Sequence, residues 1–238
     1  MIAEVTEPWQ SECPPRKPPD SCNPRVAVLS FSRNLARHPE TRVNENLTPI
    51  ACQQVLQQDA SVFSIQWLDL PPELAERQPP QRLLASYLVH IRRFTCGLVR
   101  PVRTDAEVEF RLWRTPWSLL RFSLGPVESA QQPGEQLSLR ICGGLLVQAR
   151  SCNRGELVFS RRPQGEKTRI ALLLADYCPL LLGGPEPSLL RKWLYRFTQA
   201  AIHKIVTVRF LRRVYRELAG AGACCRVVKV QVRCGEEI

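Results

Sequence analysis

The sequence lacks the short motifs that mark the commonest enzyme classes. It has no GxxxxGK[ST] phosphate-binding loop, no GxGxxG dinucleotide fingerprint, no HExxH zinc motif and no GxSxG nucleophile elbow. Histidine, the commonest proton carrier in catalysis, occurs only as His38, His90 and His203. These absences exclude the enzyme classes that depend on those motifs, and the sequence assigns no catalytic residue.

The sequence also lacks a long apolar run and an export signal. A membrane-spanning helix needs about 20 consecutive apolar residues, whereas the longest runs, around Ile170–Ala175 and Leu180–Leu182, are strand-sized or shorter. Residues 1–25 are acidic and rich in proline, without the basic start and apolar stretch of a signal peptide. We therefore expect a cytoplasmic protein with no transmembrane segment.

The 10 cysteines follow neither a metal-site pattern nor a disulfide framework. No CxxC pair is present, so a structural zinc site is not expected. A chain of 238 residues can bury a core without disulfides, and a reducing compartment keeps thiols reduced. We expect free thiols, no metal and no cofactor. The one cluster, Cys224, Cys225 and Cys234, we interpret as inert, with metal binding and acylation as alternatives.

Basic residues outnumber acidic ones. Lys and Arg total 33 against 22 Asp and Glu, which gives a formal net charge of +11. Such an excess favours a polyanionic partner, either nucleic acid or an anionic membrane surface. The alternative is that the arginines are solvated surface residues with no partner.

The distribution of proline and of apolar residues predicts the organisation of the chain. Closely spaced prolines predict an extended tail at 1–24. A single domain follows over 25–218, and a second tail over 219–238 holds a possible short strand at 226–233. Within the first part of the domain, the patterns predict strands at 25–32 and 61–70, a short helix at 50–58 and a helix at 81–93.

Between residues 104 and 177 the apolar period changes to two. Val108, Phe110 and Leu112 alternate with charged residues, and similar stretches follow at 118–124, 136–148, 155–161 and 168–177. Gly143 and Gly144 interrupt the third of these stretches. Alternation of this kind is typical of antiparallel strands with one buried face. We predict an antiparallel meander.

A long helix is predicted at 187–218. Pro187 and Ser188 give a start signal, and Gly220 and Gly222 give a stop signal. Apolar residues recur at helical spacing, and we expect the stripe Leu190–Phe197–Ala201–Ile205–Val208 to pack across the meander. The same helix is the most basic part of the chain.

Four segments resemble the second half of START-like helix-grip proteins, also called the SRPBCC, polyketide cyclase or Bet v 1-like superfamily. They read RLWRTPWSLLRFSLGP, LRICGGLLVQARSCNRGELVFSRR, TRIALLLADYCP and WLYRFTQAAIHKIVTVRFLRRVYREL. The resemblance covers about residues 105–218 and rests on element order and hydrophobic texture. It implies an α+β fold in which a curved antiparallel β-sheet wraps around a long C-terminal α-helix. The helix at 81–93 follows two strands, which departs from the usual pattern and leaves the N-terminal topology open.

The resemblance also implies a cavity between sheet and helix that holds a lipid, sterol, isoprenoid, pigment or polyketide. Residues that would line or rim this cavity are Trp113, Trp117, Phe122, Tyr177, Trp193, Phe197 and His203. Residues that would anchor an anionic group are Arg111, Arg121 and Arg140. The alternative is an ordinary core with surface arginines. Residues that would contact an anionic membrane or nucleic acid are Arg209, Arg212, Arg213 and Arg216.

Three functions are therefore open. The first is non-catalytic binding of an apolar or amphipathic small molecule, and we favour it. The second is a basic nucleic-acid-associated protein. The third is an enzyme of the cyclase or hydrolase type.

Overall fold

The structure is a computed structural model and describes residues 47–124, 134–148, 153–183 and 187–238. These residues belong to one compact unit, Asn44–Ile238. The tail predicted at 1–24 and the strand predicted at 25–32 lie outside the described residues.

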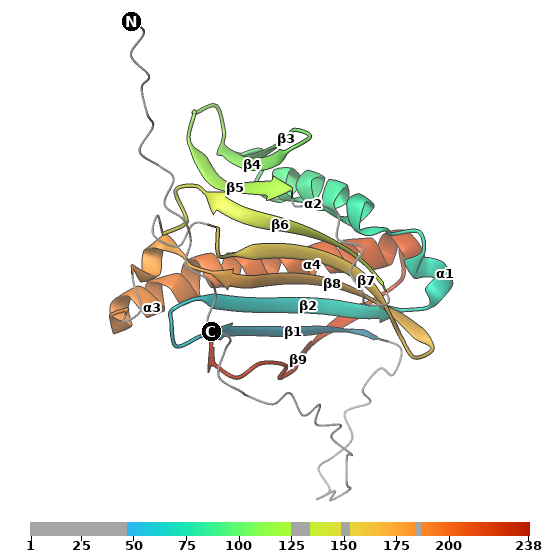
Figure 1. Cartoon of the computed structure of the whole chain (residues 1–238). Coiled ribbons are helices and arrows are strands. Elements are labelled where there is room, and N and C mark those ends of the chain that lie inside the picture. The colour runs from blue at the N-terminus through green and yellow to red at the C-terminus, as the bar shows by residue number, and fades with distance from the viewer. Residues whose placement is uncertain (1–46, 125–133, 149–152, 184–186) are drawn as a thin grey trace, which may run out of the picture. The chain divides into compact units, whose positions relative to one another are not determined.

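A 10-stranded sheet forms the body of this unit (Figure 1). Its strands are β1 (Thr48–Leu56), β2 (Val62–Leu70), β3 (Val99–Arg103), β4 (Glu107–Leu112), β5 (Ser118–Leu124), β6 (Glu135–Gly143), β7 (Glu156–Gln164), β8 (Lys167–Tyr177), β9 (Cys225–Lys229) and β10 (Glu236–Glu237). Across the sheet the order is β10-β1-β2-β8-β7-β6-β5-β4-β3, and β9 also pairs with β1. The β1–β9 pair is parallel, whereas the pairs along the main path are antiparallel.

The helices lie on one face of this sheet. They are α1 (Pro72–Ala75), α2 (Pro80–Phe94), the short 3-10 helix η2 (Leu180–Leu182) and one 31-residue C-terminal helix. The last consists of α3 (Leu189–Tyr195), the π-helical turn η3 (Arg196–Ala200) and α4 (Ala201–Ala219). α2 contacts β6 and β7, whereas α4 contacts β1 and β2 (Figure 1). Among the described residues, no helix is both long and apolar enough to cross a membrane.

The predicted fold class is confirmed. The protein is α+β, with a curved sheet wrapped around a long C-terminal helix. The start and stop signals of that helix are also confirmed. The side chain of Ser188 accepts a hydrogen bond from the backbone N–H of Arg191, 3.4 Å away. Gly220 follows the last turn with a φ of 102°, which favours glycine.

The core fills the space between the sheet and the two long helices. The Tyr87 ring of α2 contacts Phe159 of β7 and Phe210 of α4, with ring centroids 5.5 Å and 5.2 Å apart. All three side chains are buried. Aromatic and aliphatic side chains therefore fill the space between the sheet and the second half of the C-terminal helix.

The predicted packing stripe of the C-terminal helix is wrong over its first half. Leu190, Phe197 and Ile205 are 75%, 59% and 45% exposed. Val208 of the predicted stripe is buried, and the other buried residues of the helix are Tyr195, Ala200, Val206, Thr207, Phe210, Leu211 and Val214. The π-helical turn adds a residue to one turn, so Tyr195 and Ala200 share a face although they are five residues apart.

The predicted short helix at 50–58 is also wrong, because these residues form most of β1. β1 pairs with β2 on one side and with β9 and β10 on the other, and Ile50 to Leu56 are buried. The strand predicted at 61–70, the helix predicted at 81–93 and the meander strands are confirmed as β2, α2 and β4 to β8. β3 and α1 were not predicted.

Candidate functional site

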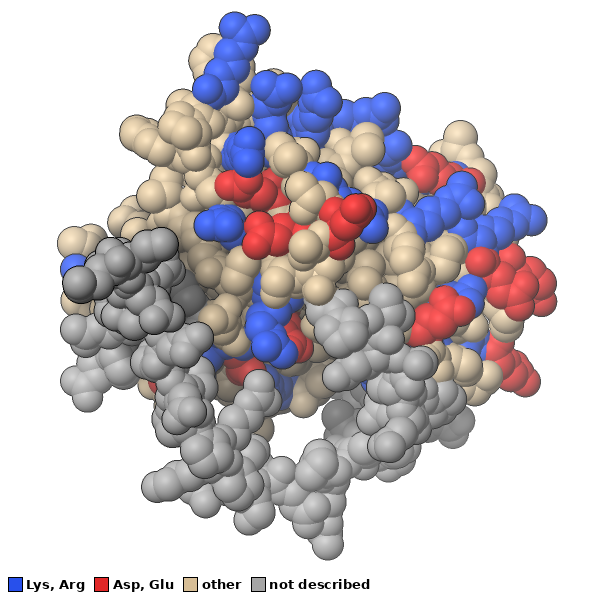
Figure 2. Space-filling view, turned by 45° about the horizontal axis from the view of Figure 1, so that its top comes forward, with Lys and Arg blue, Asp and Glu red and all other residues tan. Residues whose placement is uncertain are grey.

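The three arginines expected to anchor an anion lie on the solvent-facing side of the meander. Arg111 forms an ion pair with Glu109 at 2.6 Å, and Arg121 forms one with Glu107 at 3.4 Å. Arg140 is exposed on β6. Figure 2 shows acidic side chains among the basic ones on this side of the molecule. The fold thus places Arg111 and Arg121 beside carboxylates on the outer face of the meander.

Two of the aromatic candidates belong to the core. Phe122 is buried and meets Phe110 edge to face, with the ring centroids 5.3 Å apart. Tyr177 is buried at the end of β8, and its hydroxyl donates a hydrogen bond to the backbone oxygen of Leu146 at 2.8 Å. Burial raises the pKa of Tyr177 well above its usual value. The contacts of both side chains are therefore those of core residues.

The other aromatic candidates lie on the surface. Trp193 and Phe197 of the C-terminal helix contact each other, with ring centroids 4.4 Å apart. Trp113 and Trp117 flank the turn between β4 and β5. All four side chains are exposed. The structure therefore pairs Trp193 with Phe197 and separates both from Phe122.

The four arginines expected to contact an anionic surface recur along α4 at the three- and four-residue spacing of one helix face. Arg213 forms an ion pair with Glu217 at 2.7 Å, and the Arg209 guanidinium lies 5.4 Å from the ring centroid of Phe94. Arg209 and Arg216 are exposed, whereas Arg212 is half-buried. They therefore lie on one side of α4, where Glu217 pairs with Arg213 and the Phe94 ring lies against Arg209.

A set of polar side chains inside the seam between sheet and helix was not predicted. Strand alternation places Cys52 and Gln54 on the same face of β1 as the core residue Ile50. The β1–β2 register sets Cys52 opposite Gln66 and Gln54 opposite Ser64. All four are buried. We call Cys52, Gln54, Ser64 and Gln66 the polar seam.

Gln66 is the best-defined member of the polar seam. Its side-chain Nε2 donates to Ser64 Oγ at 2.8 Å and approaches Cys52 Sγ at 3.7 Å. Its Oε1 is buried and accepts no hydrogen bond from the described residues, and the residue as a whole is 0% exposed. A buried acceptor left without a donor costs roughly 1–3 kcal/mol. The polar seam therefore contains a buried hydrogen-bond acceptor, Gln66 Oε1, that lacks a donor.

The helix contributes polar groups above the polar seam. Gln54 donates from Nε2 to the backbone oxygen of Ala200, 3.3 Å away, at the end of the π-helical turn. Both amide atoms of the neighbouring Gln199 are buried without a partner among the described residues. His203 and Thr207 follow at four-residue intervals, and Thr207 is fully buried. The π-helical turn thus lies where the seam is polar, and such turns are frequent at functional sites.

The titratable groups of the seam are held in their neutral forms. Burial lowers the pKa of His203 from 6.5 to about 4, so its imidazole is neutral at pH 7. Burial also raises the pKa of the Cys52 thiol, although Lys204 and Lys229 oppose that rise. The polar seam itself therefore carries no charge, and the cations beside it are Lys204 and Lys229.

A cavity of about 20 Å³ adjoins the polar seam. Its lining includes Cys52, Gln54, Lys204 and Lys229. This volume is enough for one water molecule. A larger ligand would therefore require the helix to move.

A second hollow lies at the opposite end of the sheet and is larger, at about 360 Å³. It is an open groove whose lining includes Pro72, Glu135 and Arg161. The Arg161 guanidinium already bonds Glu135 at 2.8 Å and the backbone oxygen of Ala75 at 3.4 Å. Because Arg161 and Glu135 already pair with each other, this groove is a weaker candidate than the polar seam.

The described residues contain no group of three or more His, Cys, Asp or Glu side chains that could hold a metal ion. Comparisons with known protein families, with curated proteins and with solved structures find no match.

Proposed function

We propose that the protein binds a neutral amphipathic small molecule between the sheet and the C-terminal helix, without catalysing its conversion. The polar group of the ligand would lie at the polar seam, and its apolar part would lie under the helix. The observation that carries this proposal is the buried, unpartnered Oε1 of Gln66. A ligand that supplies the missing donor would account for this buried atom.

The seam restricts the chemistry of the ligand. Gln66 Oε1 is an acceptor, so the ligand would present an O–H or N–H group. The four residues of the polar seam are uncharged, and His203 is neutral at pH 7 because burial lowers its pKa to about 4, whereas Lys204 and Lys229 line the adjoining cavity. A carboxylate would have no hydrogen to donate to Gln66 Oε1, and a cationic head group would lie near the like charges of Lys204 and Lys229. A hydroxyl or amide head group on a long apolar body fits these conditions.

Entry would require the first half of the helix to move outward. Between Leu189 and Ile205, only Tyr195 and Ala200 are buried. The polar contacts that hold this half include the Gln54 bond to Ala200 and an exposed ion pair between Lys192 and Glu236 at 2.9 Å. A segment with few buried contacts opens at low cost. The packed second half, with Phe210 and Leu211, would stay in place.

We infer that the chain is a divergent START-like helix-grip protein that works in the cytoplasm. The curved sheet, the helix on its concave face and the position of the seam support this relationship. The order of strands β1 and β2 before helices α1 and α2 sets it apart from the usual pattern.

A paired-ligand titration tests the proposal. The protein is titrated with a fluorescent long-chain alcohol and with its methyl ether, which keeps the apolar body but lacks the donor. We expect the alcohol to bind about tenfold more tightly, which is the range of one well-placed hydrogen bond to a buried group. The variant Gln66→Leu should bind both molecules alike.

Gln78→Leu is the matched control. Gln78 is also buried, and its Oε1 has no hydrogen-bond partner among the described residues, but it lies between α1 and α2 in the chain. This variant should keep the wild-type preference for the alcohol. Equal binding of alcohol and ether by the wild type, or an unchanged preference in Gln66→Leu, would contradict the proposal.

A further inference from the structure

Three exposed tryptophans mark one end of the fold. Trp113, Trp117 and Trp193 are 60%, 59% and 61% exposed, whereas Trp67 is buried. Trp113 has a φ of +39°, an unusual backbone conformation for a bulky side chain. Exposed tryptophan is uncommon on a surface that contacts only water. These side chains therefore indicate a contact surface.

The segments that carry these tryptophans lie side by side. The backbone N–H of Trp113 donates to Leu98 oxygen at 2.7 Å, and that of Leu145 donates to Ser118 oxygen at 2.9 Å. The N–H of Leu180 donates to Leu146 oxygen at 2.9 Å, and η2 contacts α3. A continuous series of loops thus connects the β4–β5 turn to the start of the C-terminal helix.

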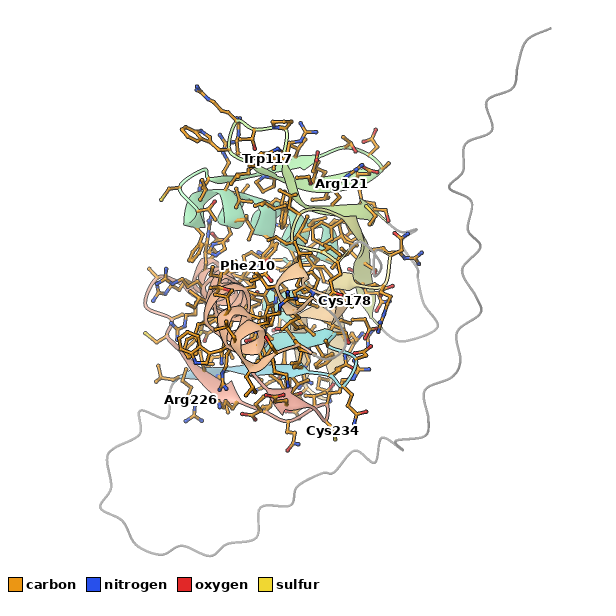
Figure 3. The ribbon with its side chains drawn as sticks, turned by 90° about the vertical axis from the view of Figure 1, so that its left-hand side faces the viewer. Trp117, Arg121, Cys178, Phe210, Arg226 and Cys234 are labelled. Carbon is orange, nitrogen blue, oxygen red and sulfur yellow. The ribbon has the colours of Figure 1, made fainter. Side chains whose placement is uncertain are left out.

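Large apolar side chains are exposed along the whole series. Figure 3 looks onto this end of the fold, with Trp117 at its top and the C-terminal helix seen nearly end-on below. We call the surface formed by these side chains the apolar end; its members are Leu98, Trp113, Trp117, Leu145, Leu180, Leu189, Leu190, Trp193 and Phe197. The apolar end is distinct from the Arg209–Arg216 part of α4, which lies further along the helix.

Positive charge predominates at the apolar end. The described stretches 94–98, 112–118, 143–148, 178–183 and 187–197 contain Arg114, Arg191, Lys192 and Arg196 and no Asp or Glu. Glu236 reaches this region from β10 and pairs with Lys192. Arg114, Arg191 and Arg196 are exposed. The surface thus combines tryptophan, leucine and excess positive charge.

We propose that the apolar end docks onto the surface of an anionic lipid bilayer. Tryptophan prefers the interface between head groups and acyl chains, leucine inserts just below it, and Arg or Lys pairs with anionic head groups. A second copy of the chain fits less well, because it would bring the same cations face to face. Nucleic acid also fits less well, because leucine neither stacks on bases nor binds phosphate. This proposal is independent of the ligand in the seam.

Vesicle co-sedimentation of the full chain tests the docking surface. The probes are vesicles of phosphatidylcholine alone and vesicles of phosphatidylcholine mixed with phosphatidylserine. We expect binding to the mixed vesicles, weaker binding to the neutral ones, and a blue shift of tryptophan fluorescence on binding. Leu190→Glu and Trp193→Glu should each weaken binding by about tenfold or more. Both side chains are exposed, so the variants should fold.

Val89→Glu is the matched control, because it makes the same change in charge at an exposed apolar residue of α2. It should bind vesicles like the wild type. Failure of the wild type to bind mixed vesicles would overturn the proposal, as would equal loss in all three variants. A wild-type dimer that becomes a monomer in Trp193→Glu would assign the surface to a second copy and also overturn it. Tight polynucleotide binding that is lost in the same two variants would do so as well.

Discussion

The ring of Tyr87 on α2 stands edge-on to the ring of Phe210 on α4, with centroids 5.2 Å apart and an interplanar angle of 80°. This contact joins the two long helices on the concave face of the sheet. Phe210 is 1% exposed, and Phe159 of β7 lies on the other side of Tyr87. The cluster fixes the second half of the C-terminal helix and leaves the first half to weaker contacts.

Phe210→Ala should therefore be strongly destabilising. Removal of a fully buried phenylalanine costs about 3–5 kcal/mol, because transfer energy is lost and a cavity remains. Urea unfolding at neutral pH measures the difference. A loss below about 1 kcal/mol would show that the ring is not in a packed core.

Ile205→Asp should have little effect on stability. Ile205 is 45% exposed, so the new carboxylate would stay in contact with water. We expect a change of no more than about 1 kcal/mol in the same urea experiment. Val206→Asp is the matched comparison one residue away, because Val206 is buried and an unpaired charge there should cost several kcal/mol. A larger loss for Ile205→Asp than for Val206→Asp would invert the assigned helix face.

Stability should fall as the pH falls from about 6.5 to 4. Burial lowers the pKa of His203 from 6.5 in the unfolded chain to about 4 in the fold, and it also lowers that of His90. In this window the unfolded chain binds protons that the folded protein does not bind. Because part of the His203 side chain reaches solvent, its share should be below the about 3 kcal/mol that complete burial would give.

The variant His203→Gln measures how much His203 contributes to this loss of stability at low pH. Urea unfolding of wild type and variant at pH 7 and near pH 4 should show a smaller loss in the variant. Identical losses in both proteins would mean that His203 is protonated as readily in the fold as in the unfolded chain.

Thiol labelling should divide the cysteines by burial. Cys96, Cys224 and Cys234 are exposed, whereas Cys52 is buried and burial raises its pKa. A maleimide at neutral pH should modify the first three within minutes in the native protein, because the thiolate reacts and must be accessible. Cys52 should react only after unfolding. Peptide mass analysis identifies the labelled cysteines in the native and in the unfolded protein. Rapid labelling of Cys52 in the native protein would contradict its burial in the polar seam.

The meander and the helices could be predicted because their signals are local. The period of two in 105–113 and 118–124 fixes strands with one buried face, and β4 and β5 match them closely. Ser188 and Gly220 mark the ends of the C-terminal helix through backbone hydrogen bonding and a positive φ. These features depend on neighbours within a few residues.

β1 could not be predicted in the same way. Its sequence TPIACQQVL contains good helix formers, and as a strand it pairs both with β2 and with β9, which brings Cys225 beside Thr48 from the far end of the chain. The polar seam was missed for the same reason. Only when 48–56 is a strand do Cys52 and Gln54 become inward positions opposite Gln66 and Ser64.

The buried face of the C-terminal helix was predicted wrongly because apolar residues occur on more than one side of this helix. Leu190 and Phe197 keep helical spacing as well as Tyr195 and Val206 do, so periodicity alone does not choose between two faces. The π-helical turn then changes the angular relation of the two halves. The side chains left outside now form part of the apolar end.

Native mass spectrometry of freshly purified protein tests the ligand proposal most directly. We predict that the wild type and Gln78→Leu carry an additional bound mass that organic extraction removes and identifies as a neutral amphipathic molecule with a hydroxyl or amide group. Gln66→Leu should lack this mass and should be at least as stable to urea as the extracted wild type, because it replaces an unpaired buried amide by an apolar side chain. A wild type without any bound mass that also fails to take up a long-chain alcohol, or a Gln66→Leu variant that retains the same ligand, would contradict the assignment of the polar seam as a binding site.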